Sequence, residues 1–187
     1  IPNYPYYVTF FYNGLGIFML MQSLRENRDT AYLMLLPVTK AEMVRARFRT
    51  VAQLELLQAL ACVPFMALRA SYGHLNNAVG IEANAAFLGL GLVQMGLFNL
   101  VFFPMHYRNA YDLGKPFVAA SVVEFFYIIL AETCDHVIPY MKTVCESYAI
   151  ADQLRQWPVL LGGAVVFALL TMAAERSSAR RFEKVDL

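Results

Sequence analysis

Residues 83–105 read ANAAFLGLGLVQMGLFNLVFFPM, a run that contains no Asp, Glu, Lys or Arg. A helix needs about 20 consecutive, mostly apolar residues to cross the hydrocarbon core of a bilayer, so this run is long enough. Four further stretches carry no charge or at most two acids: 1–24, 50–68, 116–134 and 157–174. The pattern predicts an all-α, polytopic membrane protein with five transmembrane helices in this sequence.

The composition of the whole chain agrees with this class. Of 187 residues, 59% are hydrophobic and 16% are charged, whereas about 25% is usual for a soluble domain. The net charge of +1 excludes a nucleic-acid binder that relies on a basic surface. A soluble helical bundle is disfavoured because its helices would keep a polar stripe toward water. No linker-like segment interrupts the chain, so residues 1–187 are expected to form a single transmembrane domain.

The cations alternate strongly between the segments that join the apolar runs. Twelve Lys and Arg fall in 25–49, 106–115 and 175–187, and three fall in 69–82 and 135–156. By the positive-inside rule, the first set faces the cytoplasm, and so does the C-terminus. The chain then starts outside, at Ile1, without a secretory n-region. We therefore expect a preceding helix, which gives the native subunit six spans.

Residues 25–49 read RENRDTAYLMLLPVTKAEMVRARFR and give the strongest local signal. Thr39 and Glu42 have the spacing of a capping box, in which each side chain accepts the other residue's backbone N–H. Pro37 disfavours helical geometry in the residue before it. The segment thus predicts a bend and then a helix that begins at Lys40 and continues into the next span.

Two interpretations of this cytoplasmic elbow follow from the residues alone. A rigid elbow between two membrane helices can receive force from a soluble partner and pass it to the helices. Alternatively, the loop needs a cap for stability only, and its arginines anchor it to anionic lipid. The apolar run 32–36 is too short to cross a bilayer and is expected at the interface or against another protein.

Three motifs in this elbow resemble the permease subunits of ABC-2 type ABC transporters. They are Glu26-Asn27-Arg28-Asp29, Leu35-Leu36-Pro37-Val38-Thr39-Lys40 and Met43-Val44-Arg45-Ala46-Arg47. In that family, such elements link the second and third of six spans, as in type V exporters. Within the group, the chain looks most similar to small bacterial permeases, including exporters of amphipathic peptides such as phenol-soluble modulins.

The resemblance implies a permease subunit of an ATP-driven exporter in a bacterial plasma membrane. It works with two copies of a cytoplasmic ABC ATPase and with a second copy of itself or a related permease. The ATPase-coupling residues implied are Arg25, Glu26, Asn27, Arg28, Asp29, Pro37, Val38, Thr39, Lys40, Glu42, Arg45 and Arg47. The only Gly-Lys pair, Gly114-Lys115, lacks the pattern of a phosphate-binding loop. ATP and Mg are therefore expected on the partner ATPase, and this chain is expected to be no enzyme and to hold no cofactor.

Three acids lie within the predicted spans: Glu55, Glu124 and Glu132. A charged acid that faces lipid at mid-bilayer costs roughly 2.5–3.5 kcal/mol. They are possible translocation-path residues that contact cationic parts of a substrate. They are equally consistent with burial as neutral or hydrogen-bonded groups. A third alternative is a proton-coupled secondary transporter that uses Glu124 and Glu132.

Other candidate chemistry lies toward the predicted outer side. Glu132, Asp135 and His136 have i, i+3, i+4 spacing, which suits a metal-dependent intramembrane enzyme or, as we expect, a solvated polar turn without metal. His74 and His106 are expected in loops. The extracellular segment 135–156 is predicted to form an amphipathic helix on the membrane surface after its Pro139.

The three cysteines, Cys62, Cys134 and Cys145, do not have the spacing of a metal framework. A disulfide between Cys134 and Cys145 is chemically possible on the outer side, but we expect two free thiols because nothing in the spacing is diagnostic. No catalytic residue is predicted.

Overall fold

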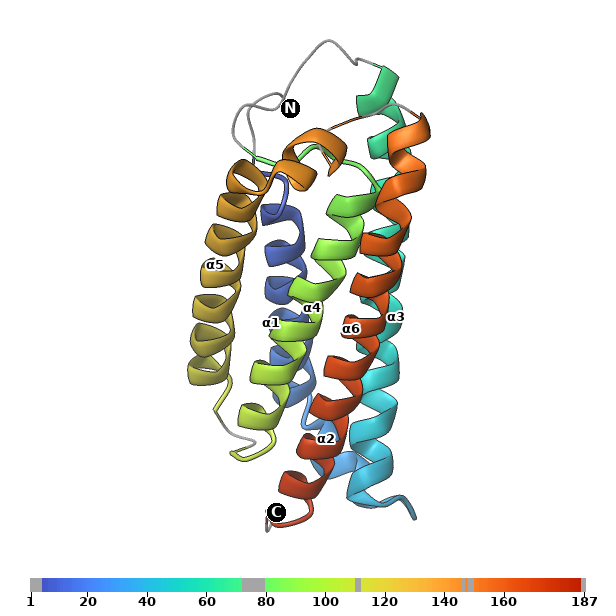
Figure 1. The fold of residues 1–187 in the computed structure, drawn as a ribbon. Helices are drawn as coiled ribbons and strands as arrows, with labels where there is room; N and C mark the ends of the chain where they lie inside the picture. Colours follow the sequence, from blue (N-terminus) through green and yellow to red (C-terminus); the bar gives the residue numbers. More distant parts are fainter. Residues whose placement is uncertain (1–4, 72–79, 110–111, 146, 148–149, 186–187) are drawn as a thin grey trace.

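The computed structural model describes residues 5–71, 80–109, 112–145, 147 and 150–185, and every regular element within these ranges is helical. The elements are α1 (Val8–Glu26), α2 (Asp29–Leu33), α3 (Lys40–Ser71), α4 (Ala85–His106), α5 (Gly114–Val137), the π-helix η1 (Met141–Cys145) and α6 (Ile150–Phe182). Helices α1, α3, α4, α5 and α6 run roughly along one axis, with α2 and the C-terminus at one end and η1 at the other (Figure 1). We call these the elbow end and the far end.

Four of the described helices are long and apolar enough to cross a membrane: α3, α4, α5 and α6. The prediction of a polytopic, all-helical membrane protein is therefore confirmed. Helix α1 packs against α4 and α5 in the same bundle, but it does not meet the same criterion of length and hydropathy. A fifth crossing by α1 stays a prediction.

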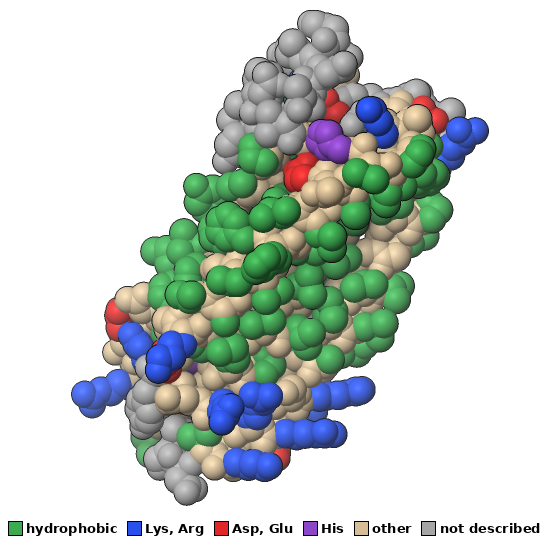
Figure 2. Space-filling model, turned by 60° about the vertical axis from the view of Figure 1, so that its left-hand side comes forward, with side chains coloured by type: hydrophobic (Ala, Val, Ile, Leu, Met, Phe, Trp, Pro, Cys, Tyr) green, Lys and Arg blue, Asp and Glu red, His purple; other side chains and the backbone are tan. Residues whose placement is uncertain are grey.

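Helix α4, which contains the charge-free run, is the centre of the bundle. Of its most apolar window, 72% is buried inside the protein, against 11–17% for the other three spans. The outward faces of α3, α5 and α6 carry large apolar side chains, such as Phe65, Phe126 and Leu161. On the face seen in Figure 2, apolar side chains form a belt between two ends that bear charges. A helix that is apolar on all sides, such as α4, is expected in the core of a protein. The apolar belt on the outside suits contact with lipid chains.

Two glycines allow α4 and α6 to pack closely. A Cβ added at Gly163 of α6 would collide with the backbone of Gly89 on α4, and a Cβ at Gly89 would lie 2.5 Å from the Val159 carbonyl oxygen. Small residues that let backbones approach are typical of helix contacts in membranes. This contact makes α4 and α6 the tightest pair in the bundle.

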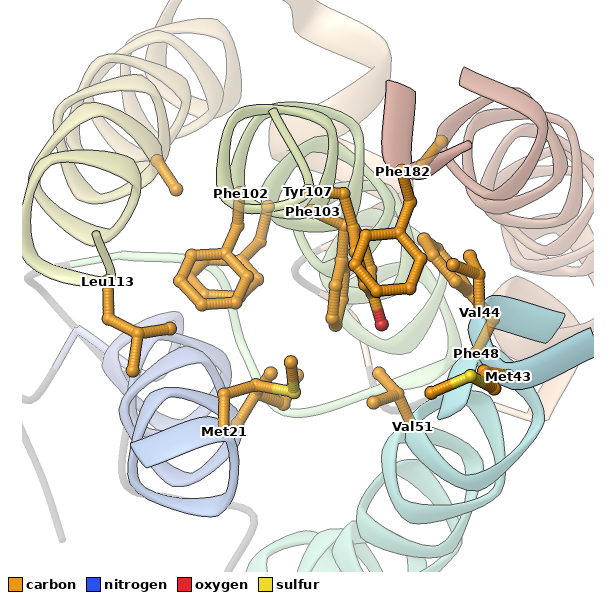
Figure 3. Close-up of a cluster of buried hydrophobic side chains, with 14 residues drawn as sticks. Met21, Met43, Val44, Phe48, Val51, Phe102, Phe103, Tyr107, Leu113 and Phe182 are labelled. Carbon is orange, nitrogen blue, oxygen red and sulfur yellow. The ribbon is translucent and has the colours of Figure 1, made fainter. Parts of the chain in front are cut away.

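The core at the elbow end is mainly aromatic. Phe48 of α3 packs on Phe103 of α4 with ring centroids 4.5 Å apart, and Tyr107 packs on Phe182 at the end of α6 at 5.1 Å. Figure 3 shows these rings together with Met21 of α1 in one cluster. Four helices are therefore joined immediately beside the elbow.

The helix directions reproduce the predicted alternation of the connecting segments. Helices α1, α4 and α6 end at the elbow end, and α3 and α5 begin there (Figure 1). The three segments that contain twelve of the fifteen cations thus lie together at that end. Which end faces the cytoplasm stays a prediction.

One expectation about local structure was wrong. His106 is not in a loop, because α4 continues past Pro104 and His106 is its last residue. The His106 ring stacks on Phe102 and is 4% exposed. His74 lies outside the described residues.

The expected surface helix after Pro139 lies partly outside the described residues and stays a prediction. Residues 139–145 are helical and include η1, and α6 begins at Ile150. Asp152 in the first turn of α6 favours helix there through the helix dipole and lies 3.6 Å from Arg155 in an i, i+3 ion pair. The three cysteines are free.

Candidate functional site

The predicted capping box is present at the start of α3. The Thr39 backbone N–H donates to Glu42 Oε2 at 2.8 Å, and the Glu42 backbone N–H donates to Thr39 Oγ1 at 3.2 Å. Helix α3 begins at Lys40 and continues without a break to Ser71. Glu42 lies before the apolar part of this helix, and the hydrogen bond from the Thr39 backbone lowers the pKa of its carboxyl. The cap ties the bend to the first turn of a membrane helix.

The turn between α1 and α2 depends on an unusual backbone conformation at Arg28. This residue has φ 53° and ψ 31°, the only positive φ of a non-glycine residue in the described part of the chain. The left-handed region costs roughly 1–2 kcal/mol for such a residue. It reverses the chain so that α2 folds back beneath the bundle.

Arg47 of α3 ties α2 to the bundle. One of its terminal nitrogens donates to Asp29 Oδ2 at 2.6 Å and to Thr30 Oγ1 at 2.9 Å. The Arg47 side chain is only 11% exposed. The two halves of the elbow, which sequence analysis treated as separate motifs, are thus joined through a partly buried ion pair.

The elbow is also connected to the C-terminal part of α6. Lys40 Nζ donates to the Val185 carbonyl oxygen at 2.6 Å and lies 6.0 Å from the centre of the Phe182 ring. Arg45 Nε lies 3.4 Å from Glu175 Oε1. These contacts join residues more than a hundred positions apart, and no local pattern in the sequence indicates them.

The outer surface of the elbow combines charged and apolar side chains. The apolar part, which we call the apolar patch, consists of Tyr32, Met34, Leu35, Leu36 and Val38. Its members are exposed, and Leu35 reaches 82%. Most of the other predicted coupling residues are exposed as well: Arg25, Glu26, Asn27, Arg28, Pro37, Thr39, Glu42 and Arg45. Asp29, Lys40 and Arg47 instead lie partly buried in contacts within the chain.

Two of the three membrane acids form hydrogen bonds with amide side chains of α4. Asn99 Nδ2 donates to Glu55 Oε2 of α3 at 2.9 Å, and Gln94 Nε2 donates to Glu124 Oε1 of α5 at 3.2 Å. Asn99 also donates to Thr171 of α6 at 3.3 Å. Glu55 is 0% and Glu124 is 1% exposed. We call these five residues the interior polar layer.

In the single chain, this layer favours the interpretation that the acids are buried as hydrogen-bonded groups. Glu55 and Glu124 are buried and hydrogen-bonded to amides, and neither faces the outer surface. Glu132 lies apart, where it packs against Gly80 at the far end. Sequence analysis missed Gln94 and Asn99, although two amides inside a charge-free run signal polar partners.

The residues considered for metal binding do not converge. Within the described part of the chain, no group of three or more potential metal ligands gathers. His136 Nδ1 lies 2.9 Å from the Glu132 carbonyl oxygen of its own helix.

The apolar belt, the four spans and the capped elbow define a polytopic helical membrane protein with a braced elbow at one end. A comparison with protein families identifies this class further. The family model for ABC-2 family transporter proteins matches residues 1–183, and the chain belongs to that family. Searches of curated proteins and of solved structures found no match.

Proposed function

We propose that this chain is the permease subunit of an ATP-driven exporter and that the elbow is its contact with the ATPase. The observation that carries the proposal is the ABC-2 family match over residues 1–183. That family implies an ABC ATPase and a membrane as partners. The elbow supports the proposal because it presents an apolar patch beside exposed charges on a rigid support.

The contacts inside the elbow suit the transmission of a movement. A force on the apolar patch reaches α3 through the capping box and through the ion pair of Arg47 with Asp29. It reaches α6 through Lys40 and Arg45. An elbow braced in this way moves with α3 and α6 as one unit, which is a requirement for switching a bundle between two packings.

We propose hydrophobic or amphipathic substrates, such as peptides, and a second permease copy across an apolar face. The large apolar side chains on the outer faces of α3, α5 and α6 support both suggestions. Glu55 and Glu124 are covered by α4 in the single chain. They remain candidates for a translocation path that opens when α4 separates from α3 or α5.

The proposal is tested on the permease purified with its ATPase in lipid nanodiscs. The double variant Glu42→Ala, Pro37→Ala and the single variant Leu35→Ser are expected to lower substrate-stimulated ATP hydrolysis. Leu35→Ser is informative because an 82% exposed side chain has little role in folding. Glu183→Ala, an exposed acid at the same end, is the matched control.

The outcomes separate the proposal from its rivals. Unchanged stimulation and transport in both variants would exclude the elbow as the coupling element. Transport driven by a pH gradient, in vesicles without ATP or ATPase, would instead favour the secondary transporter that uses Glu124 and Glu132.

A further inference from the structure

A pocket of ≈390 Å³ opens at the elbow end, where α1, α2, α3, α4 and α6 meet. Arg25 lies at it from the last turn of α1, Arg28 from the turn before α2, and Arg47 from α3. The end of α4 contributes His106 and Tyr107. The remaining lining is mainly apolar and includes Met21, Leu24, Met34 and Phe182. The pocket thus has a cationic side and an apolar side.

Two buried polar side chains line the inner end of this pocket. His106 is 4% and Tyr107 is 1% exposed. The Tyr107 hydroxyl interacts with the Arg47 guanidinium, and the His106 ring interacts with the Asp112 backbone. Because a guanidinium only donates hydrogen bonds, the hydroxyl proton of Tyr107 has no acceptor among the described residues. Figure 3 shows the Tyr107 hydroxyl oxygen at the end of the ring that points away from the axis of α4. Native proteins rarely leave a buried donor unpaired, so this proton points to a ligand.

The charge of the pocket selects an anion. Its lining contains three guanidinium groups, and the nearby carboxylate of Asp29 is already 2.6 Å from Arg47. Arg28 is held toward the pocket in a strained left-handed conformation, and such strain concentrates at functional sites. Guanidinium groups bind phosphate through paired, charge-assisted hydrogen bonds.

We propose that this pocket binds the phosphate headgroup of an anionic phospholipid from the adjacent leaflet. The phosphate lies between Arg28 and Arg47 and accepts a hydrogen bond from the Tyr107 hydroxyl. The first acyl carbons lie along Met21, Leu24 and Met34. The volume lies within the range of about 300–1,000 Å³ usual for small-molecule sites, and basic pockets between membrane helices suit such headgroups.

A phospholipid fits this pocket better than an acidic side chain of the ATPase. The pocket reaches inward to the end of α4, and beside its polar residues it presents an apolar side formed by Met21, Leu24, Ala31, Met34 and Phe182. The surface that suits a soluble partner is the apolar patch on the outside of the elbow. A bound headgroup would connect α1, α2, α3 and α4 and would hold the elbow in place.

The test measures binding of dioctanoyl phosphatidylglycerol to the purified full-length protein in detergent. Dioctanoyl phosphatidylcholine has the same chains without net charge, and inorganic phosphate is the free anion. We expect phosphatidylglycerol to bind at least tenfold more tightly than either. Because one charge-assisted hydrogen bond changes affinity by roughly tenfold, Arg28→Gln and Tyr107→Phe should each weaken binding by about that factor.

Arg49→Gln is the matched control, because Arg49 is an exposed cation of the same segment that does not line the pocket. It should stay within twofold of the wild type. Tyr107→Phe keeps the aromatic packing and so separates loss of binding from loss of folding. Equal binding of the two lipids, or an equal loss in Arg49→Gln, overturns the proposal. Tight binding of inorganic phosphate, or displacement of phosphatidylglycerol by the ATPase alone, overturns the assignment to lipid.

Discussion

The substitution Gly163→Ala tests the closest helix contact in the fold. A Cβ at this position would collide with the carbonyl oxygen and Cα of Gly89 on α4. The neighbouring Gly162 is a matched control in the same turn of α6, because a Cβ there meets nothing within 4 Å. The two variants make the same chemical change and differ only in what the new methyl group contacts.

The structure sets the size of the expected difference. Alanine is favoured over glycine inside a helix by roughly 1 kcal/mol, and Gly162→Ala should keep most of this gain. At Gly163 the obstructing atoms belong to the backbone and cannot rotate away, so α4 and α6 must separate. Overpacking of this kind costs about 1–3 kcal/mol. The separation also lengthens the hydrogen bond from Asn99 to Thr171, which already measures 3.3 Å.

The assay is reversible unfolding of the purified protein in mixed micelles of increasing denaturing detergent. The chain has a single tryptophan, Trp157, and it lies on α6, so its fluorescence follows the helix that is altered. We expect Gly163→Ala to lower the free energy of unfolding by about 2 kcal/mol, and Gly162→Ala to leave it unchanged or raise it. Equal effects of the two substitutions would refute the close approach of α4 and α6.

Five further substitutions, at four positions, test the elbow and the interior polar layer. Thr39→Ala should cost about 1 kcal/mol in unfolding free energy, and the stabilisation that ionised Glu42 gives should vanish at acid pH. Because the pKa of Glu42 is lowered, this stabilisation is complete above the ordinary pKa of glutamate and is lost as the pH falls through the lowered pKa. The thermal midpoints of the wild type and of Glu42→Gln should therefore converge at acid pH. Glu55→Leu should lower the free energy of unfolding by about 1–3 kcal/mol, because Asn99 Nδ2 loses the bond to Glu55 and keeps only that to Thr171. Glu55→Gln should lower it by less in the same detergent titration. Arg28→Gly should raise the thermal midpoint, with a gain of about 1 kcal/mol, since glycine adopts a positive φ without strain, and an unchanged or lower midpoint would contradict that strain.

Local patterns in the sequence were sufficient for the helices and their starts. The charge-free run 83–105 predicted α4, and the spacing of Thr39 and Glu42 predicted the first residue of α3. Both depend on residues close together in the chain, where helix geometry fixes the outcome. The end of α4 was predicted less well, because His106 was expected in a loop, whereas α4 includes it beyond Pro104.

Contacts between helices were not predictable in the same way. The sequence placed Glu55 and Glu124 in membrane helices but gave no partner, because periodicity does not reveal which helix faces which. Asn99 and Gln94 became meaningful only when α4 proved to be the central helix. Similarly, Lys40 looked like part of a partner surface, whereas it bonds to the Val185 carbonyl oxygen.

The distribution of polar contacts indicates how a movement of the elbow would spread through the bundle. Lys40 and Arg45 link the elbow to α6, and the glycine contact holds α6 against α4. Helix α5 is joined to α4 by the hydrogen bond from Gln94 to Glu124 at 3.2 Å and by that from the Tyr127 hydroxyl to the Leu90 carbonyl oxygen at 2.8 Å. A force on the elbow therefore acts first on α3, α6 and α4, and these two bonds pass it on to α5. Glu124 takes part in one of them, so a separation of α5 from α4 would expose this acid.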